Sequence, residues 1–229
     1  MNLKNWPKKA YILAIITSIQ FLIFTNLSML FYPGGTFSDP NTVGYSIFLN
    51  LFSDLGRFIA HSGESNLISF IMYNISLFLM GTLLIPYFIM FPHLFTKEEG
   101  KGYCTAGSVI GIGVSVSMMG ASLTPADLFY VTHVSFGFFK FVTLLPLAIL
   151  YALAILQNRS YSKSYAMVYI IFGIIQFLFL LIMTFGVGQQ KISIIFAAGQ
   201  NIVVNAMAIC FLIQAYGAWK MQKNLIISI

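Results

Sequence analysis

Residues 67–92 read LISFIMYNISLFLMGTLLIPYFIMFP, and none of these side chains is charged. A helix needs about 20 mostly apolar residues to cross the roughly 30 Å hydrocarbon core of a bilayer. The stretch meets that length, and neighbouring helices in a membrane tolerate a proline such as Pro86 within it. It therefore predicts a transmembrane helix and places the chain among membrane proteins.

Five other apolar runs of similar length accompany this one. Of the 229 residues, 59% are hydrophobic and 8% are charged, whereas soluble domains carry about 25% charged residues. The predicted spans cover residues 10–32, 67–92, 104–122, 128–156, 165–187 and 192–218. No polar linker separates them, so we expect residues 1–229 to form a single all-α bundle of six transmembrane helices. The first run is longer than the apolar core of a signal peptide and lacks a clear cleavage site, so we expect it to be retained.

Basic residues at the ends of the spans predict how the bundle is oriented. Nine of them fall on one side of the membrane: Lys4, Lys8, Lys9, Lys97, Lys101, Arg159, Lys163, Lys220 and Lys223. The other side has only Arg57 and Lys191. Loops rich in Lys and Arg stay in the cytoplasm, so we expect a multi-pass protein of the cell membrane with both termini cytoplasmic. Because these charges are scattered along span ends, nucleic acid is not an expected partner.

Residues 33–66 form the longest connection and are expected to make an extracytoplasmic lid. Connections of this length are usually functional or disordered, and this one has a helical pattern between Tyr45 and His61. Its apolar residues follow helical spacing: Phe48, Phe52, Leu55 and Ile59. Its polar residues fall on the opposite face: Asn50, Asp54, Arg57 and His61. The pattern predicts an amphipathic lid helix, lying on the outer leaflet or in the mouth of the bundle.

The fourth span follows Thr124-Pro125-Ala126-Asp127 and has two polar residues on one face. Asp127 is either a cap near the start of this helix or part of a site. His133 and Lys140 are seven residues apart, and Lys140 lies about 18 Å from the outer end of the span at 1.5 Å per residue. A charge near the centre of a span costs about 2.5–3.5 kcal/mol on insertion scales, so we expect either a polar partner or a hydrated cavity around Lys140. The candidate partners are Asn74, Gln176, Gln200, Asn201 and Asn205.

Together these residues predict an outward-facing polar site at the mouth of the bundle. The candidate catalytic residues are Asp54, His61, Asp127 and His133. The candidate ligand-binding residues are Asn50, Arg57, Lys140, Gln200 and Asn205. Arg57 offers a planar fork for a phosphate group. Our first hypothesis is therefore that the site binds the head group of a lipid, an anionic one in particular, or of another amphiphile, with hydrolysis of that ligand as an open extension.

Other functions fit the same residues. An intramembrane hydrolase would use a metal held by the histidines and aspartates, or Ser53 as a nucleophile beside a histidine. No HExxH, GxSxG or HxxxH motif supports that chemistry, and the residues identify neither a metal nor a cofactor. A transporter or channel would line its path with Lys140, Gln176, Gln200 and Asn205. A scaffold without a ligand is the remaining alternative, and the oligomeric state is not predicted.

Several segments resemble a family of bacterial and archaeal membrane proteins known as domain of unknown function 998. They are Tyr32-Pro33-Gly34-Gly35, Asn50-x-Phe52-Ser53-Asp54-Leu55-Gly56, Thr124-Pro125-Ala126-Asp127 with His133, and Gln200-Asn201 with Asn205. The pattern covers most of the chain. The resemblance implies a six-helix membrane bundle and directs attention to Asp54, Asp127 and His133, but it implies no activity. FRAG/DRAM-like membrane proteins, some linked to lipid remodelling, look distantly similar in having six spans and an outward polar loop.

Overall fold

The computed structural model describes residues 6–186 and 194–227, and six long helices make up most of them. The helices are α1 (Trp6–Ser28), α2 (Leu67–Met90), α3 (Lys101–Leu123), α4 (Tyr130–Gln157), α5 (Lys163–Gly186) and α6 (Ile194–Ile227). The short 3-10 helices are η2 (Met29–Phe31), η3 (Phe52–Gly56), η4 (Phe91–Leu94) and η5 (Lys97–Glu99). Each long helix could cross a membrane by length and composition, so the predicted six-helix, all-α fold is confirmed. Predicted span positions 187 and 192–193, together with Lys4 and Lys191, lie outside the described residues.

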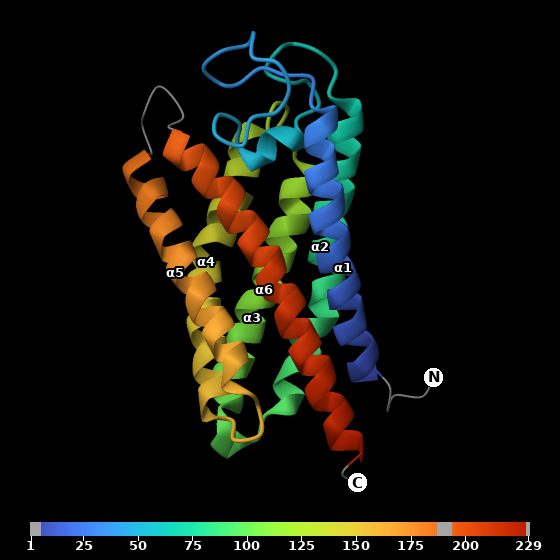
Figure 1. Ribbon diagram of the computed structural model, residues 1–229, viewed down its shortest axis with the longest axis vertical. Coiled ribbons are helices and arrows are strands. Elements are labelled where there is room, and N and C mark those ends of the chain that lie inside the picture. The colour runs from blue at the N-terminus through green and yellow to red at the C-terminus, as the bar shows by residue number, and fades with distance from the viewer. Residues whose placement is uncertain (1–5, 187–193, 228–229) are drawn as a thin grey trace.

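The six helices form a closed ring. Each long helix packs against the next along the chain, and α6 packs against α1. The beginning of α1 and the end of α6 lie at the same end of the bundle (Figure 1), which we call the terminus end. Residues 33–66 cover the opposite end (Figure 1), and we refer to them as the lid.

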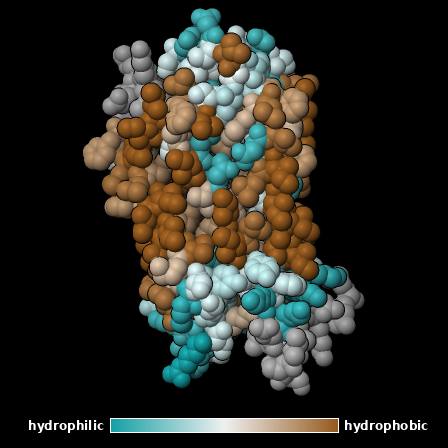
Figure 2. Space-filling view, viewed as in Figure 1, coloured by the Kyte–Doolittle hydropathy of each residue, from teal (hydrophilic) through white to brown (hydrophobic). Residues whose placement is uncertain are grey.

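The outer surface of the ring is hydrophobic. On the face that Figure 2 shows, hydrophobic residues form a broad band across the helices, and hydrophilic residues gather mainly at the two ends. Ile16, Phe138 and Ile174, on three different helices, are each more than half exposed. Exposed apolar surface on this scale marks contact with a membrane or a partner protein. The six apolar helices beneath it make this a multi-pass membrane protein.

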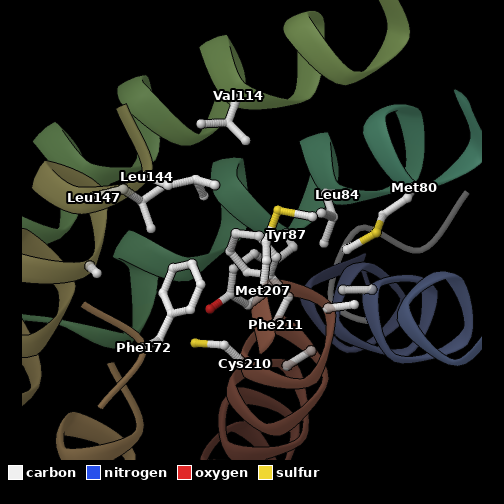
Figure 3. Close-up of a cluster of buried hydrophobic side chains, with 14 of the residues drawn as sticks. Met80, Leu84, Tyr87, Val114, Leu144, Leu147, Phe172, Met207, Cys210 and Phe211 are labelled. Carbon is white, nitrogen blue, oxygen red and sulfur yellow. The ribbon is translucent and has the colours of Figure 1, made fainter. Parts of the chain in front are cut away.

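The interior of the ring is filled by large side chains. Figure 3 shows Tyr87, Met207 and Phe211 lying together between α2 and α6. Nearer the terminus end, the ring centroids of Phe91 and Tyr151 are 5.0 Å apart. Protein interiors of this kind are packed as densely as organic crystals, so the middle of the bundle is a solid core.

The lid lacks the predicted amphipathic α-helix. Between Tyr45 and His61 the only helical segment is η3, a five-residue 3-10 helix, with turns before and after it. Phe52 and Leu55 are buried, whereas Phe48 and Ile59 of the same predicted apolar face are 56% and 38% exposed. The helical interpretation of this segment was therefore wrong.

Local hydrogen bonds explain why an α-helix does not form. Asn50 Oδ1 accepts a bond from the N–H of Ser46 at 3.0 Å, and Asp54 Oδ2 accepts one from the N–H of Leu51 at 2.9 Å. Side chains of Asn and Asp that bind nearby backbone in this way compete with helical hydrogen bonds. The polar face that the spacing predicts is consequently turned inward, onto the backbone of the lid.

The lid also inserts into the mouth of the bundle. The ring centroid of Phe52 lies 6.1 Å from that of Phe21 on α1 and 5.6 Å from that of Tyr73 on α2. A Cβ on Gly56 would lie 2.6 Å from the Tyr73 ring, so the backbone there can approach α2 only because it is glycine. The lid is thus a plug seated between helices, which agrees with one of its two predicted positions.

Candidate functional site

Asp54 holds the centre of the lid. Its carboxylate is buried, and Oδ2 accepts hydrogen bonds from the Leu51 N–H at 2.9 Å and from Asn50 Nδ2 at 3.2 Å. Oδ1 lies 3.2 Å from His61 Nε2. A buried charge is tolerated only when it is paired and hydrogen-bonded. Three of the predicted site residues, Asn50, Asp54 and His61, are therefore brought together.

Tyr32 and Gly35 extend this cluster towards α1. Asn50 Nδ2 donates to the carbonyl of Gly35 at 2.8 Å, and the hydroxyl of Tyr32 donates to the same carbonyl at 3.4 Å. The Tyr32 oxygen also accepts a bond from the N–H of His61 at 3.3 Å. Burial, together with the nearby charge of Asp54, raises the pKa of Tyr32 to about 12. The hydroxyl is therefore a permanent donor at neutral pH.

Two residues of α6 also hold the lid through hydrogen bonds. Gln200 Oε1 accepts a hydrogen bond from the N–H of Phe52 at 2.7 Å. Asn201 Nδ2 donates to the carbonyl of Asn50 at 3.0 Å, and Asn201 Oδ1 accepts from the Tyr45 hydroxyl at 2.8 Å. The side-chain oxygen of Gln200, a predicted ligand-binding residue, is thus engaged in a hydrogen bond with the lid backbone.

Asp127 binds the lid rather than capping its own helix. Its carboxylate accepts hydrogen bonds from the N–H groups of Phe58 at 3.0 Å and Ile59 at 2.9 Å. Because α4 begins only at Tyr130, the interpretation of Asp127 as a helix cap was wrong. Arg57 Nε donates to the Ile59 carbonyl at 3.1 Å, and among the described residues it forms no ion pair with an acid. The cluster around Asp54 and the contact of Asp127 with Phe58 and Ile59 are therefore separate anchors of one lid.

Asn66, the last residue of the lid, and Ser69 and Asn74 on α2 fix the lid in a way that the sequence interpretation missed. They donate to lid carbonyls: Asn66 to Leu55 and Arg57, Ser69 to Leu55, and Asn74 to Gly56. Asn66 and Ser69 are three residues apart, a spacing that places side chains on one face of a helix, and that was the available signal. Asn74, expected beside Lys140, instead holds the lid.

His133 lies below the lid and joins α3 to α4. Its Nδ1 is 2.7 Å from the carbonyl oxygen of Thr124 and 3.1 Å from that of Ala121, so it carries a proton and donates to both. The last carbonyls of a helix have no partner within that helix, and His133 supplies one for α3. This predicted catalytic residue is thus placed as a structural link.

Lys140 does not have the polar partners that its depth led us to expect. It is 6% exposed, and its Nζ lies 4.4 Å from the centroid of the Phe141 ring. Among the described residues its ammonium makes no hydrogen bond or ion pair. Gln176, one of the expected partners, donates to the Phe141 carbonyl at 2.7 Å. The prediction of a polar network around Lys140 was therefore wrong.

A groove of about 300 Å³ opens where α1, α6 and the lid meet. Its lining includes the amides of Asn26, Asn201 and Asn205 and the apolar side chains of Met29, Phe48 and Ile202. Figure 2 shows hydrophilic residues reaching below the lid into the hydrophobic band, over the upper part of α6 on the side facing α1. The groove thus combines polar groups with the surface that faces lipid.

The asparagines of the groove are ordered by their hydrogen bonds. Asn26 Nδ2 donates to Asn205 Oδ1 at 3.2 Å and to the Leu22 carbonyl at 2.7 Å. Asn205 Nδ2 donates to the Asn201 carbonyl at 2.9 Å. Asn26 is exposed, and its Oδ1 makes no hydrogen bond within the described part of the chain. Sequence reasoning named Asn205 but missed Asn26, whose signal was an amide in the last turn of an apolar span.

No protein family, curated protein or solved structure matches this chain significantly. The resemblance to domain of unknown function 998 therefore stays a prediction. Within the described residues, no group of three or more His, Cys, Asp or Glu side chains is placed to hold a metal ion.

Proposed function

We propose that this protein binds a membrane amphiphile in the groove between α1, α6 and the lid. The observation that supports this is a mostly apolar groove, with Phe48 and Ile202 in its lining, that also has Asn26, Asn201 and Asn205 along it. Ligand sites are mostly apolar concavities of about 300–1,000 Å³ with a few polar groups that fix orientation. The amides would hold the head of the ligand, and the apolar walls would hold the first part of its chain.

Binding without hydrolysis is the form of this function that the geometry favours. The carboxylates of Asp54 and Asp127 accept hydrogen bonds from the lid backbone, and His133 donates one to the end of α3. A nucleophile paired with a base, which nucleophilic hydrolysis requires within hydrogen-bond reach, is not found among the described residues that line the groove. The groove therefore supports recognition or carriage of an amphiphile.

The lid end is proposed to be extracytoplasmic. Eight described basic residues belong to the terminus end: Lys8, Lys9, Lys97, Lys101, Arg159, Lys163, Lys220 and Lys223. Among the described residues, the lid end has Arg57 alone. The excess of basic residues marks the cytoplasmic side, so both termini of the bundle would face the cytoplasm.

Cysteine labelling in intact cells tests this orientation. Val43 in the lid is 97% exposed, and Lys220 at the terminus end is also exposed. Both natural cysteines are buried and give a silent background. A membrane-impermeant maleimide is expected to label Val43→Cys in intact cells and Lys220→Cys only after permeabilisation. The reverse pattern would overturn the proposed orientation.

Retention of a ligand by the purified protein tests the groove. We expect native mass spectrometry to find one amphiphile retained by the wild-type protein after delipidation. Ile202→Trp fills the groove without removing an amide, and retention should fall at least tenfold. Thr184→Val is the matched control, because within the described residues this exposed hydroxyl on α5 bonds only to the Leu180 carbonyl of its own helix. Equal retention by wild type and Ile202→Trp would refute binding in the groove.

A further inference from the structure

We propose that the ligand of this groove is an uncharged lipid that presents a hydroxyl group, with diacylglycerol as the simplest member of its class. The inference rests on the proposed function and narrows it. It departs from the anionic head group that Arg57 suggested in the sequence. Two independent properties of the site support it: the charges around the groove and the hydrogen-bonding groups that remain free within it.

The charges around the groove disfavour a phosphate. Among the residues that the structure describes, no charged side chain lines it. Arg57 is placed elsewhere, since its Nε is bound to the Ile59 carbonyl beside Asp127. The described acidic residues of the lid end are Asp39, Asp54, Glu64 and Asp127, four carboxylates against the single guanidinium of Arg57. Phosphate recognition relies on Arg, Lys or several free N–H donors, and the described lining of this site offers a phospholipid head group no basic side chain.

The hydrogen-bonding groups left free at the groove include an acceptor. Asn201 uses both ends of its amide in the bonds described above, whereas in the described part of the chain Asn205 Nδ2 makes one of its two possible hydrogen bonds, to the Asn201 carbonyl. Asn26 Nδ2 faces two oxygens, those of Leu22 and Asn205, which fixes the orientation of its amide and leaves Oδ1 pointing away from both. Asn26 Oδ1 is therefore free, among the described residues, to accept a hydrogen bond from a ligand hydroxyl.

The size and position of the groove suit a ligand that arrives from within the bilayer. A volume of about 300 Å³ is at the small end for ligand sites, enough for a compact head group and the first part of an acyl chain. Phe48 and Ile202, which form its walls, are more than half exposed on the lipid-facing surface. The rest of the chain can therefore stay in the lipid while the hydroxyl reaches Asn26.

Photo-crosslinking in nanodiscs of phosphatidylcholine tests the class of ligand. The probes are photoactivatable diacylglycerol, its 3-O-methyl ether, and phosphatidic acid with the same chains. On the wild-type protein we expect the diacylglycerol probe to label peptides of α1 and α6 at least tenfold more than either other probe. Asn26→Leu should reduce that labelling to the level of the methyl ether, and Thr184→Val should leave it unchanged.

The outcomes separate the two proposals. Groove labelling by phosphatidic acid that equals or exceeds that of diacylglycerol would overturn the uncharged ligand while leaving groove binding intact. Equal labelling by diacylglycerol and its methyl ether would overturn recognition of the hydroxyl. Labelling that no unlabelled lipid displaces and that Ile202→Trp does not reduce would overturn the proposed function itself. The comparison of the three probes uses the wild-type protein, so it does not depend on how the variants fold.

Discussion

Replacing Asp54 with Ala is expected to release the lid and to lower the free energy of unfolding by about 3–5 kcal/mol. The change leaves the Leu51 N–H, the amide of Asn50 and the imidazole of His61 without their shared acceptor. Each buried polar group left unpaired costs about 1–3 kcal/mol. The measurements are thermal unfolding in detergent micelles and limited proteolysis, which should cleave the lid between η3 and α2.

Two variants control this result. Glu64→Ala removes an exposed carboxylate from the same lid and should change neither the unfolding midpoint nor the cleavage pattern. Asp54→Asn keeps the shape of the side chain and one acceptor oxygen. Its loss of stability should therefore be smaller than that of Asp54→Ala and larger than that of Glu64→Ala. If Asp54→Ala behaves like Glu64→Ala, the lid is held by other contacts and the central role of Asp54 is wrong.

Replacing Lys140 with Met is expected to stabilise the protein by about 2 kcal/mol. The ammonium is buried within α4, and among the described residues it has no hydrogen bond or ion pair to offset its lost hydration. Met has a similar length and no charge, and insertion scales put the cost of a central lysine at about 2.5–3.5 kcal/mol. Part of that cost is already offset by the Phe141 ring, 4.4 Å from Nζ. Unfolding in denaturant, followed by the fluorescence of Trp219, measures the change.

Lys163→Met is the matched control because that lysine is well partnered. Its Nζ donates to the carbonyls of Ile155, Leu156 and Asn158 at 2.9, 2.7 and 2.6 Å, and so closes the end of α4. Its replacement should lower stability. If Lys140→Met is also destabilising, the Phe141 ring outweighs the cost of burial, and Phe141→Leu should then destabilise the protein strongly.

The six helices could be predicted because length and apolarity alone determine whether a segment can span a bilayer. Each observed helix overlaps its predicted span, and the described ends differ by a few residues except at α6, which continues to Ile227. The ends of the spans are less predictable because hydrogen bonds of individual side chains near each end determine where the helix begins or stops. At the start of α4, for example, Asp127 is drawn to the lid backbone at Phe58 and Ile59, and the helix begins three residues later than Asp127.

The interior of the lid could be predicted only in part. Asn50, Asp54 and His61 were grouped correctly because their spacing of four and seven residues places them near one another. The same spacing fits an amphipathic helix, and nothing local reveals that Asn50 and Asp54 would bind backbone instead. The contacts that decide the matter come from Gln200 and Asn201, 148 and 151 residues further along the chain.

The groove could not be predicted because it belongs to no single segment. Asn26 and Asn205 meet only because α6 closes the ring against α1, and their bond joins residues 179 positions apart. Each amide, taken alone, resembles an ordinary polar residue near the end of a span. The prediction for Lys140 failed in the opposite way. Its depth in the span suggested polar partners, but the side chains that pack around it in the described structure form no hydrogen bond with its ammonium.

The anchors of the lid also impose an order on the assembly of the chain during translation. The lid is synthesised between the first two helices, but its partners Asp127, Gln200 and Asn201 follow 69 to 151 residues later. Until α6 has entered the membrane, the backbone of the lid lacks the hydrogen bonds that Gln200 and Asn201 make with Phe52, Ile47 and Asn50. A chain halted before α6 should therefore expose a lid that proteases cleave more readily than in the complete bundle.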